Sequence, residues 1–533
     1  MLGSACFFLW TRKGENQISS PKLFSILNDE SITNPISVSL FVISVLLYPV
    51  LLIGIGFWRA RAIKNHADFM VAGRSLPVTY LVGSLVCTWI GAGTLFGSAG
   101  LAYRSGISAL WFSIGAWVGL VAVYIIAPRV RNLAQYTVPD LLEQRYNAAT
   151  RILGTIAIIL AYVTIAAYQF RGGGWILSIV TDGAISPATG MFITAGTIVL
   201  FTSVAGMVSI VSVDIINGVF IVLGVLFALP YFVFTNGGIA EVYGSVPDEL
   251  LSPLGGHNFL WVLGVALPTF LLLFGESGMY QKFFSAKNAR AARKAVVGMI
   301  VGIVVVESAV VLLSLAGRSI YPDLITETSI LGRAASETVV LYIARNGLPA
   351  IGGAVLLAAA IAIVLSSGST MLLVPSTNIT RDIYERFINP GASDVYKLKL
   401  QRLSIVVLGA IGLILLTQFD TVLSMALYAY SVVGATLTPV LMAAFFWKRV
   451  TPQGGVACIA GGLTTIVGLV ILSRMGVGFE VSIGGTVFDF ASSDYIVIPA
   501  VMISIGLLII VSLFTLASPE EKWSPFFNSP VRN

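Results

Sequence analysis

The sequence predicts an all-α integral membrane protein with about 13 transmembrane helices, in which two inverted five-helix repeats follow one extra helix and precede two more. Three observations predict this fold class. The chain is 57% hydrophobic and only 11% charged, which is less than half the charged fraction of ordinary soluble domains. Apolar runs long enough to cross a bilayer follow one another along the chain. Two of these runs are interrupted by glycines at corresponding positions of the two halves.

The apolar runs are the candidate spans, because about 20 helical residues cross the hydrocarbon of a bilayer. They lie at roughly 36–58, 77–102, 106–128, 151–180, 187–206, 210–234, 258–281, 293–317, 347–376, 402–419, 421–447, 454–474 and 494–516. We expect residues 1–35 to form a poorly ordered extension, since their one apolar stretch is too short to span. Residues 517–533 are expected to form a cytoplasmic tail.

The basic residues predict the orientation in the membrane. Lys and Arg gather in the loops that the order of spans places on one side, around 59–74, 129–151, 282–294, 381–402 and 448–449. Because cytoplasmic loops carry the excess of Lys and Arg, the N-terminus is predicted outside and the C-terminus in the cytoplasm. We therefore expect a multi-pass protein of the plasma (inner) membrane. The net charge of +6 reports this topology and does not indicate a nucleic-acid partner.

The spans divide into two halves. Residues 77–234 hold core helices 1–5 and residues 258–447 hold core helices 6–10, with 36–58 before them and two C-terminal helices in 454–516. Because five is odd, the halves enter the membrane from opposite faces. Core helix 1 contains Gly91 and Gly93, and core helix 6 contains Gly275-Glu276-Ser277-Gly278. Interrupted helices at matching positions predict a binding site near the membrane midplane.

A cluster of hydroxyl groups lies inside the apolar span 347–376. Its members are Ser366, Ser367, Ser369 and Thr370. Polar atoms left without partners at bilayer depth cost several kcal/mol each, so something buried must use them. Neutral oxygens suit a small hard cation. Packing between helices is the structural alternative, since Ser, Thr and Gly are common at membrane helix interfaces.

Carboxylates also fall inside spans, and besides Glu276 at the break of core helix 6 we consider Asp214 and Glu307. An ionisable side chain at this depth is a candidate functional group, and Asp214, near the cytoplasmic end of core helix 5, is the stronger of the two. Asp214 could hold a cation, carry a proton or make structural hydrogen bonds. Glu307 lies among Val and Ile and needs a partner that the sequence does not identify.

Four stretches, taken in order, resemble the sodium–solute symporter family over roughly residues 36–516. They are Gly73-Arg74-Ser75-Leu76 leading into Thr88-Trp89-Ile90-Gly91-Ala92-Gly93, the segment 206–217 around Asp214, Gln281-Lys282-Phe283-Phe284-Ser285-Ala286-Lys287-Asn288, and the hydroxyl cluster followed by Thr380-Arg381-Asp382-Ile383-Tyr384. Val213 and Asn217 stand where the family pattern often has Thr and Gln. The resemblance implies a LeuT-type inverted-repeat fold and sodium-coupled uptake of a small organic solute.

The resemblance also implies ion sites. A sodium site between core helices 1 and 8 would use the backbone carbonyls of Cys87, Ile90 and Ile363 and the hydroxyls of Ser366 and Ser367. The glycine-rich break is consistent with this, because it displaces the amides that would otherwise bind carbonyls of the preceding turn. A possible second sodium site would use Asp214, Ser369 and Thr370.

The solute site is expected among core helices 1, 3, 6, 8 and 10. Candidate residues are Trp89, Thr94, Tyr168, Gln169, Arg171, Phe274, Glu276 and Tyr428. Arg171 could bind a solute carboxylate, and Trp89 could stack on a quaternary ammonium. For Arg171 we favour structural roles, either a pair with Glu276 or a side chain that reaches outward.

The predicted function is secondary active transport: sodium-coupled symport of an amino acid, a monocarboxylate or a pantothenate-like solute by alternating access. A proton-coupled or choline-like cation transporter of the same fold is the alternative. An enzyme is not expected, because neither His66 nor His257 lies in a span, and no segment resembles the selectivity filter of a channel. The expected partners are sodium, the small solute and the lipid bilayer, and no obligate protein partner is expected. Sodium is expected to act as the coupling ion and not as a tightly bound cofactor.

Overall fold

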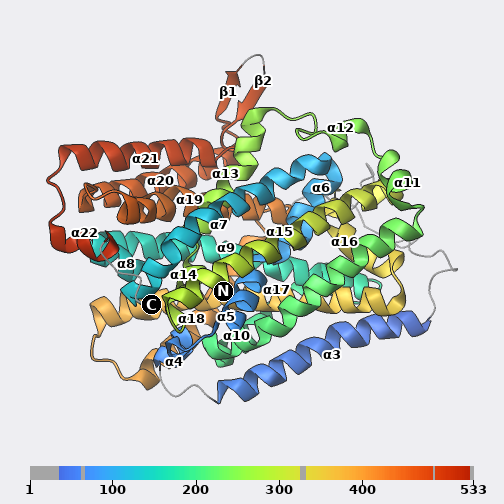
Figure 1. The fold of residues 1–533 in the computed structure, drawn as a ribbon, viewed down its shortest axis with the longest axis horizontal. Coiled ribbons are helices and arrows are strands. Elements are labelled where there is room, and N and C mark those ends of the chain that lie inside the picture. Colours follow the sequence, from blue (N-terminus) through green and yellow to red (C-terminus); the bar gives the residue numbers. More distant parts are fainter. Residues whose placement is uncertain (1–34, 62–65, 325–331, 484–485, 528–533) are drawn as a thin grey trace, which may run out of the picture.

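The computed structural model describes residues 35–61, 66–324, 332–483 and 486–527. Within these ranges the chain forms a bundle of long helices with one small hairpin (Figure 1). Apart from Pro35, the expected N-terminal extension lies outside the described residues. The division into repeats at 77–234 and 258–447 remains our proposal for the domain organisation.

The first half of the chain contains α3 to α10. In order, its elements are α3 (Pro35–Ala60), α4 (His66–Val71), η1 (Ala72–Arg74), α5 (Val78–Trp89), η2 (Gly93–Ser98), α6 (Ala99–Ser105), η3 (Gly106–Ala109), α7 (Leu110–Leu133), α8 (Val138–Arg145), α9 (Ala148–Val180) and α10 (Pro187–Thr235).

The second half continues from the loop after α10. Its elements are α11 (Gly238–Gly244), α12 (Asp248–Leu251), α13 (Phe259–Gly275), α14 (Ser277–Ser285), α15 (Ala289–Ile320), η4 (Pro322–Leu324), η5 (Gly332–Thr338), α16 (Val339–Tyr342), η6 (Ile343–Gly347), α17 (Ala350–Asn378), η7 (Ile379–Ile388), α18 (Asp394–Leu416) and α19 (Val422–Phe446). The C-terminal part holds α20 (Pro452–Arg474), the antiparallel hairpin β1 (Glu480–Ile483) and β2 (Thr486–Asp489), α21 (Val497–Phe514) and α22 (Glu520–Phe527).

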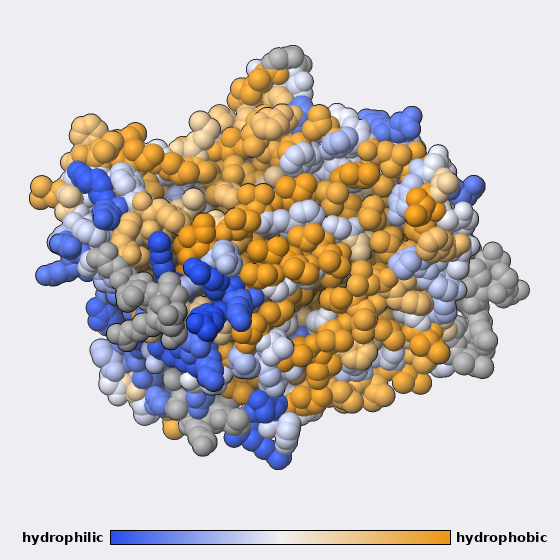
Figure 2. Space-filling view, in the orientation of Figure 1, coloured by the Kyte–Doolittle hydropathy of each residue, from blue (hydrophilic) through white to orange (hydrophobic). Residues whose placement is uncertain are grey.

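The predicted class, an all-α membrane protein, is confirmed. Over the described ranges, 11 helical segments are long and apolar enough to cross a membrane, and Val78–Trp89 is a shorter apolar helix. Figure 2 shows an apolar surface across the middle of the molecule, with hydrophilic residues toward two sides. Leu46, Leu47 and Val50 of α3 are among the exposed apolar side chains, as expected of residues that face lipid. The count of about 13 spans stays a prediction.

The longest helix, α10, contains two of the predicted spans. Its 49 residues would extend roughly 70 Å, more than twice the hydrocarbon thickness. Gly206 breaks it with φ 57° and ψ −176°, a conformation that residues with a side chain avoid. A Cβ at this position would also lie 2.6 Å from the ring of Phe69. The break therefore separates the predicted spans 187–206 and 210–234.

Both predicted interruptions are present. Helix α5 ends at Trp89, and Ile90 leaves the helical region with ψ 93° before η2 begins. Between α13 and α14, Glu276 has ψ 103°, and its carboxylate accepts hydrogen bonds from the amides of Gly278 and Met279. Glu276 thus caps α14 and satisfies amides that have no partner within the helix.

Helix α17 lies at the centre of the bundle. It packs against α3, α9 and α10, while α19 packs against α9 and α13. Almost every residue from Leu356 to Asn378 of α17 is buried, including the whole hydroxyl cluster. The polar groups of this helix must therefore find partners on neighbouring helices.

Candidate functional site

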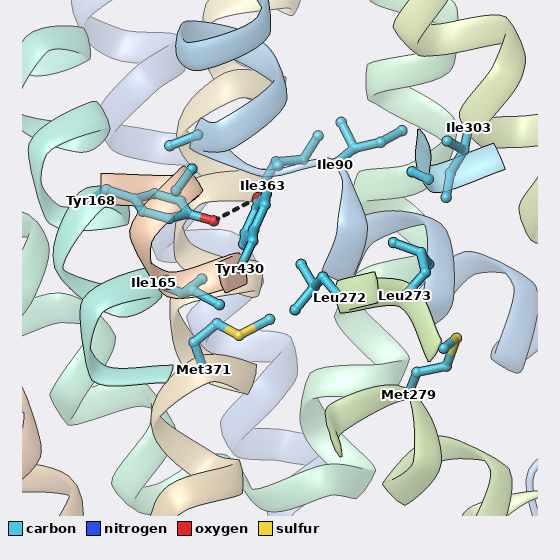
Figure 3. Packing of buried hydrophobic residues seen from close by; sticks show 14 of the residues in the cluster. Ile90, Ile165, Tyr168, Leu272, Leu273, Met279, Ile303, Ile363, Met371 and Tyr430 are labelled. Carbon is cyan, nitrogen blue, oxygen red and sulfur yellow. Dashed lines mark hydrogen bonds between the residues drawn. The ribbon is translucent and has the colours of Figure 1, made fainter. Parts of the chain in front are cut away.

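A small cavity lies between the two broken helices. Figure 3 shows part of its wall. The cavity is lined by Leu85, Thr88 and Trp89 of α5, Ile165, Tyr168 and Gln169 of α9, Leu272 and Leu273 of α13, Glu276, Met279 of α14, Met299 of α15, Met371 of α17 and Tyr430 of α19. Its position agrees with the predicted midplane site, because both interrupted helices contribute to it.

Aromatic rings form one wall of the cavity. The hydroxyls of Tyr168 and Tyr430 share a hydrogen bond of 3.1 Å, the dashed line in Figure 3. Tyr430 stacks on Trp89, with ring centroids 6.2 Å apart, and on Phe112, with centroids 6.1 Å apart. Trp89, Tyr168 and Tyr430 give the cavity flat apolar faces that suit a compact solute.

Glu307 of α15 fixes the indole of Trp89. Its Oε1 accepts a hydrogen bond from Trp89 Nε1 at 2.7 Å, and its Oε2 accepts one from Trp117 Nε1 at 2.7 Å. These indoles are the partners that the sequence did not identify. Because Glu307 is buried, the two bonds hold Trp89 in a defined orientation at the edge of the cavity.

Gln169 closes the break in the first interrupted helix. Its Oε1 accepts a hydrogen bond from the amide of Ala92 at 2.9 Å. A Cβ at Gly91 would lie 2.7 Å from Gln169 Nε2 and 3.1 Å from Ser367 Oγ. Glycine at position 91 therefore lets α9 and α17 approach the break closely.

The predicted solute residues separate into two groups. Trp89, Tyr168, Gln169 and Glu276 line the cavity. The other four do not: Thr94 is buried in η2, Phe274 packs near Phe446, Tyr428 donates to the carbonyl of Ala491 at 3.1 Å, and Arg171 binds the end of α18. Tyr430, two residues after Tyr428 and so on the other side of α19, lines the cavity as well.

Arg171 does not form the pair with Glu276 that was one of its two favoured roles. Its Nη2 donates to the carbonyls of Leu416 and Phe419 at 2.7 and 2.6 Å. The last carbonyls of a helix have no partner within it, so a buried guanidinium can satisfy them. Glu276 accepts instead from the hydroxyl of Tyr162 at 2.5 Å. The expected Arg171–Glu276 pair was wrong.

The residues predicted for the first sodium site come from α5 and α17. Ser367 Oγ donates to the carbonyl of Cys87 at 2.8 Å, so one predicted hydroxyl and one predicted carbonyl are in contact. Ser366 Oγ donates to Oδ1 of Asp214. Ile90 and Ile363 are fully buried. A hydroxyl that donates its proton keeps lone pairs for a cation, so these contacts are compatible with the predicted ligand set.

The residues predicted for the second sodium site are not grouped as expected. Asp214 accepts from Ser366 and from Ser84 Oγ, and its Oδ2 lies 3.8 Å from Lys282 Nζ. Ser369 Oγ donates to the carbonyl of Leu365 at 2.7 Å. Thr370 Oγ1 has no hydrogen-bond partner within the ranges that the structure covers. The carboxylate therefore interacts with groups other than Ser369 and Thr370.

Sequence analysis missed Lys282 as a functional residue. It belongs to a stretch quoted above only for its resemblance, yet its side chain is fully buried. Its ammonium donates to the carbonyl of Ser84 at 2.8 Å and to Thr88 Oγ1. A signal was available, because a lysine directly after the apolar span 258–281 is costly to bury unless it has a partner.

An ion-pair network joins α8, α9 and η7 at one end of the bundle. The guanidinium of Arg151 lies 2.6 Å from Asp140, 2.5 Å from Glu143 and 2.5 Å from Asp382. Arg386 of η7 also binds Glu143, at 2.7 Å. Burial raises the pKa of Glu143, but its bonds to Arg386 and Arg151 outweigh that effect and leave the pKa below its usual value.

A cavity to which two interrupted helices contribute, in a bundle of apolar spans, is typical of a secondary transporter. The model of the sodium:solute symporter family matches residues 69–462. The chain belongs to the sodium:solute symporter family, and sodium is its coupling ion.

Several relatives are similar over most of the chain. The osmoregulated proline transporter OpuE of Bacillus subtilis is 25% identical over 91% of this chain and 97% of its own length. The high-affinity proline transporter PutP of the same organism is 27% identical over 78% of this chain and 88% of its own. A sodium/proline symporter of Staphylococcus aureus is 25% identical over 80% of this chain and 85% of its own.

Solved structures share the fold. A Na+-coupled sialic acid symporter superimposes with a TM-score of 0.73 at 16% identity, covering 90% of this chain and 99% of that one. Mhp1, a nucleobase-cation-symport-1 family transporter, gives 0.52 at 12% identity, covering 87% of this chain and 99% of that one. The LeuT-type fold that the resemblance implied is thereby confirmed.

Proposed function

We propose that the protein couples the entry of sodium to the uptake of proline, or of an amino acid of similar size and polarity, across the plasma membrane. The cavity between the interrupted helices is the observation that carries this proposal. Most of its lining side chains are apolar or aromatic, and its few polar groups come from Thr88, Gln169, Glu276 and two tyrosines. A solute with a small apolar ring fits such a wall, whereas a solute with many hydroxyls would lose hydrogen bonds on entering.

The names of the relatives support the same solute class. Proline transporters from two organisms match over most of this chain. At such identities the solute can differ between relatives, so the solute of this protein is inferred from the cavity and the relatives together. Arg171 does not supply a partner for the carboxylate of the solute, because it binds the carbonyls of Leu416 and Phe419.

For sodium we propose the ligands predicted above: the carbonyls of Cys87, Ile90 and Ile363 and the hydroxyls of Ser366 and Ser367. The contact between Ser367 and the carbonyl of Cys87 supports this set, because it brings α5 and α17 together where the ion would bind. The end of α5 at Ile90 supports it as well, since a helix end leaves carbonyls without amide partners. We also propose that the N-terminus lies on the outer side of the membrane. We further propose that the protein transports its solute without catalysing a reaction.

A compact quaternary ammonium solute is the second candidate. Trp89, Tyr430 and Phe112 present neighbouring aromatic faces, and such faces attract quaternary ammonium groups. This arrangement is the one observation that favours the choline-like alternative.

Uptake by purified protein in liposomes tests both candidates. With an inward sodium gradient we expect accumulation of labelled proline and not of labelled choline, and no accumulation with a potassium gradient of the same size. Proton coupling would instead appear as uptake driven by a pH gradient without sodium. Thermal stabilisation of the purified protein by sodium, measured with proline or choline present, identifies the ligand independently. Stabilisation by choline and not by proline would contradict the proposed solute.

A further inference from the structure

A buried lysine and a buried aspartate face each other where α5, α10, α14 and α17 meet. Lys282 Nζ of α14 lies 3.8 Å from Asp214 Oδ2 of α10, and neither side chain is exposed. The remaining contacts of the carboxylate are hydroxyl donors, Ser84 on Oδ2 and Ser366 on Oδ1. The pair thus combines one negative and one positive charge away from solvent.

The surroundings of Lys282 Nζ resemble those of a bound cation. The ammonium has three N–H donors, and three oxygens surround it: the carbonyl of Ser84 at 2.8 Å, Thr88 Oγ1 and the more distant Asp214 Oδ2. A carbonyl, a hydroxyl and a carboxylate are also the ligand types that a sodium ion would use. Lys282 therefore places a positive charge beside Asp214, within a set of oxygens of the kind that a cation binds.

We propose that Lys282 is a covalently attached counter-ion that takes the place of a second sodium at Asp214, so that one sodium accompanies each solute. This inference rests on the proposed sodium-coupled uptake. A second sodium added beside the pair would leave a net positive charge buried without compensation, which is unfavourable in a low-dielectric interior. The contacts of Ser369 within its own helix agree with this view, because its hydroxyl donates to the carbonyl of Leu365.

The counter-ion links the ion site to the solute cavity. Thr88, which accepts a hydrogen bond from Lys282, lines the cavity. Ser366, which donates to Asp214, is a proposed ligand of the first sodium. The Lys282–Asp214 pair therefore contacts residues of both sites. Because the two charges of the pair cancel, Asp214 adds no net charge beside the first sodium site.

The ratio of sodium to solute tests the proposal directly. Purified native protein in liposomes, assayed with labelled sodium and labelled proline, should take up one sodium per proline, with a Hill coefficient for sodium near one. Lys282→Met keeps the side-chain length and removes the charge, so Asp214 is left uncompensated. In this variant we expect a second sodium to bind, the ratio to rise to two and the Hill coefficient to increase toward two.

Three variants serve as controls. Lys282→Arg keeps the charge and should retain a ratio of one. Lys287→Met makes the same change at an exposed lysine of the same segment and should also leave the ratio at one. The double variant Asp214→Asn with Lys282→Met removes both charges and should return the ratio to one. Sodium-dependent thermal stabilisation of each purified variant gives the same comparison without transport.

Two results would overturn the inference. The first is a ratio of two sodium ions per proline in the native protein, which needs no variant to fold. The second is a Lys282→Met protein that is folded but binds sodium as the native protein does. Uptake in the native protein that does not depend on sodium would instead contradict the proposed function, so the two failures are distinguishable.

Discussion

The indole of Trp89 donates a hydrogen bond of 2.7 Å to the carboxylate of Glu307. Trp89 ends α5 at the helix break and lines the solute cavity, while Glu307 lies in the middle of α15. The second carboxylate oxygen accepts from Trp117 of α7, also at 2.7 Å. Glu307 thus fixes the position of Trp89 in the cavity wall, although its own helix, α15, provides few of the residues that line the cavity.

Replacing Glu307 should weaken solute binding. Glu307→Ala removes both acceptors and leaves two buried indole N–H groups unpaired, a loss of about 1.5–3 kcal/mol per charged bond. If only the lost bond to Trp89 weakens solute binding, the half-saturating concentration of the solute should rise roughly 10- to 150-fold in this variant. Saturation curves for proline and for sodium on the same variant measure the effect.

Trp117→Phe is the matched control for Glu307→Ala. It removes the other hydrogen bond of Glu307 and keeps the bond to Trp89. Proline saturation should stay within a few-fold of the native curve. An equally large change in this variant would mean that Glu307 acts on the fold and not on the position of Trp89.

Removing the hydroxyls of the first sodium site should weaken sodium activation. Ser366→Ala and Ser367→Ala each remove one neutral ligand, worth about 1–3 kcal/mol or roughly 5- to 150-fold in apparent sodium affinity. The double variant should lose coupled uptake while remaining in the membrane. Ser369→Ala, whose hydroxyl bonds within α17, is the matched control and should activate like the native protein. Unchanged sodium activation in the double variant would refute the ligand set.

Arg171→Gln should lower stability without altering solute saturation. The guanidinium satisfies the carbonyl of Leu416 at the end of α18 and that of Phe419 in the segment that follows, and bonds to a charged group contribute about 1.5–3 kcal/mol each. We expect a lower melting temperature of the purified protein and an unchanged half-saturating proline concentration. A large rise in that concentration, with normal stability, would instead make Arg171 a solute ligand.

Acid should weaken the contact between α8 and η7 through Glu143. Its bonds to Arg386 and Arg151 lower its pKa in the folded protein. A carboxylate of this kind stabilises the fold above its ordinary pKa of about 4.3, and this contribution is lost as the pH falls below that value. The melting temperature should therefore drop more steeply in acid for the native protein than for Glu143→Gln. Parallel curves would show that Glu143 adds nothing to stability.

The sequence alone determined the features that depend on local composition. Apolar runs predict spans because bilayer thickness fixes their length. Gly91 and Gly275 mark the two breaks in the sequence, and the backbone leaves the helical region at the adjacent Ile90 and Glu276. Four of the eight predicted solute residues line the cavity. They were found because an interrupted helix and its neighbours in the bundle must surround the site.

Only the tertiary structure decided which polar group meets which. Helical periodicity places Ser366, Ser369 and Thr370 on one face of α17, but it does not say which neighbouring helix lies opposite each turn. Asp214 consequently meets Ser366 and Lys282, a lysine 68 positions away in sequence (282 − 214). Glu307 and Arg171 likewise have partners on distant segments. In a membrane interior every buried charge must find a partner, and the packing of the helices determines which one it is.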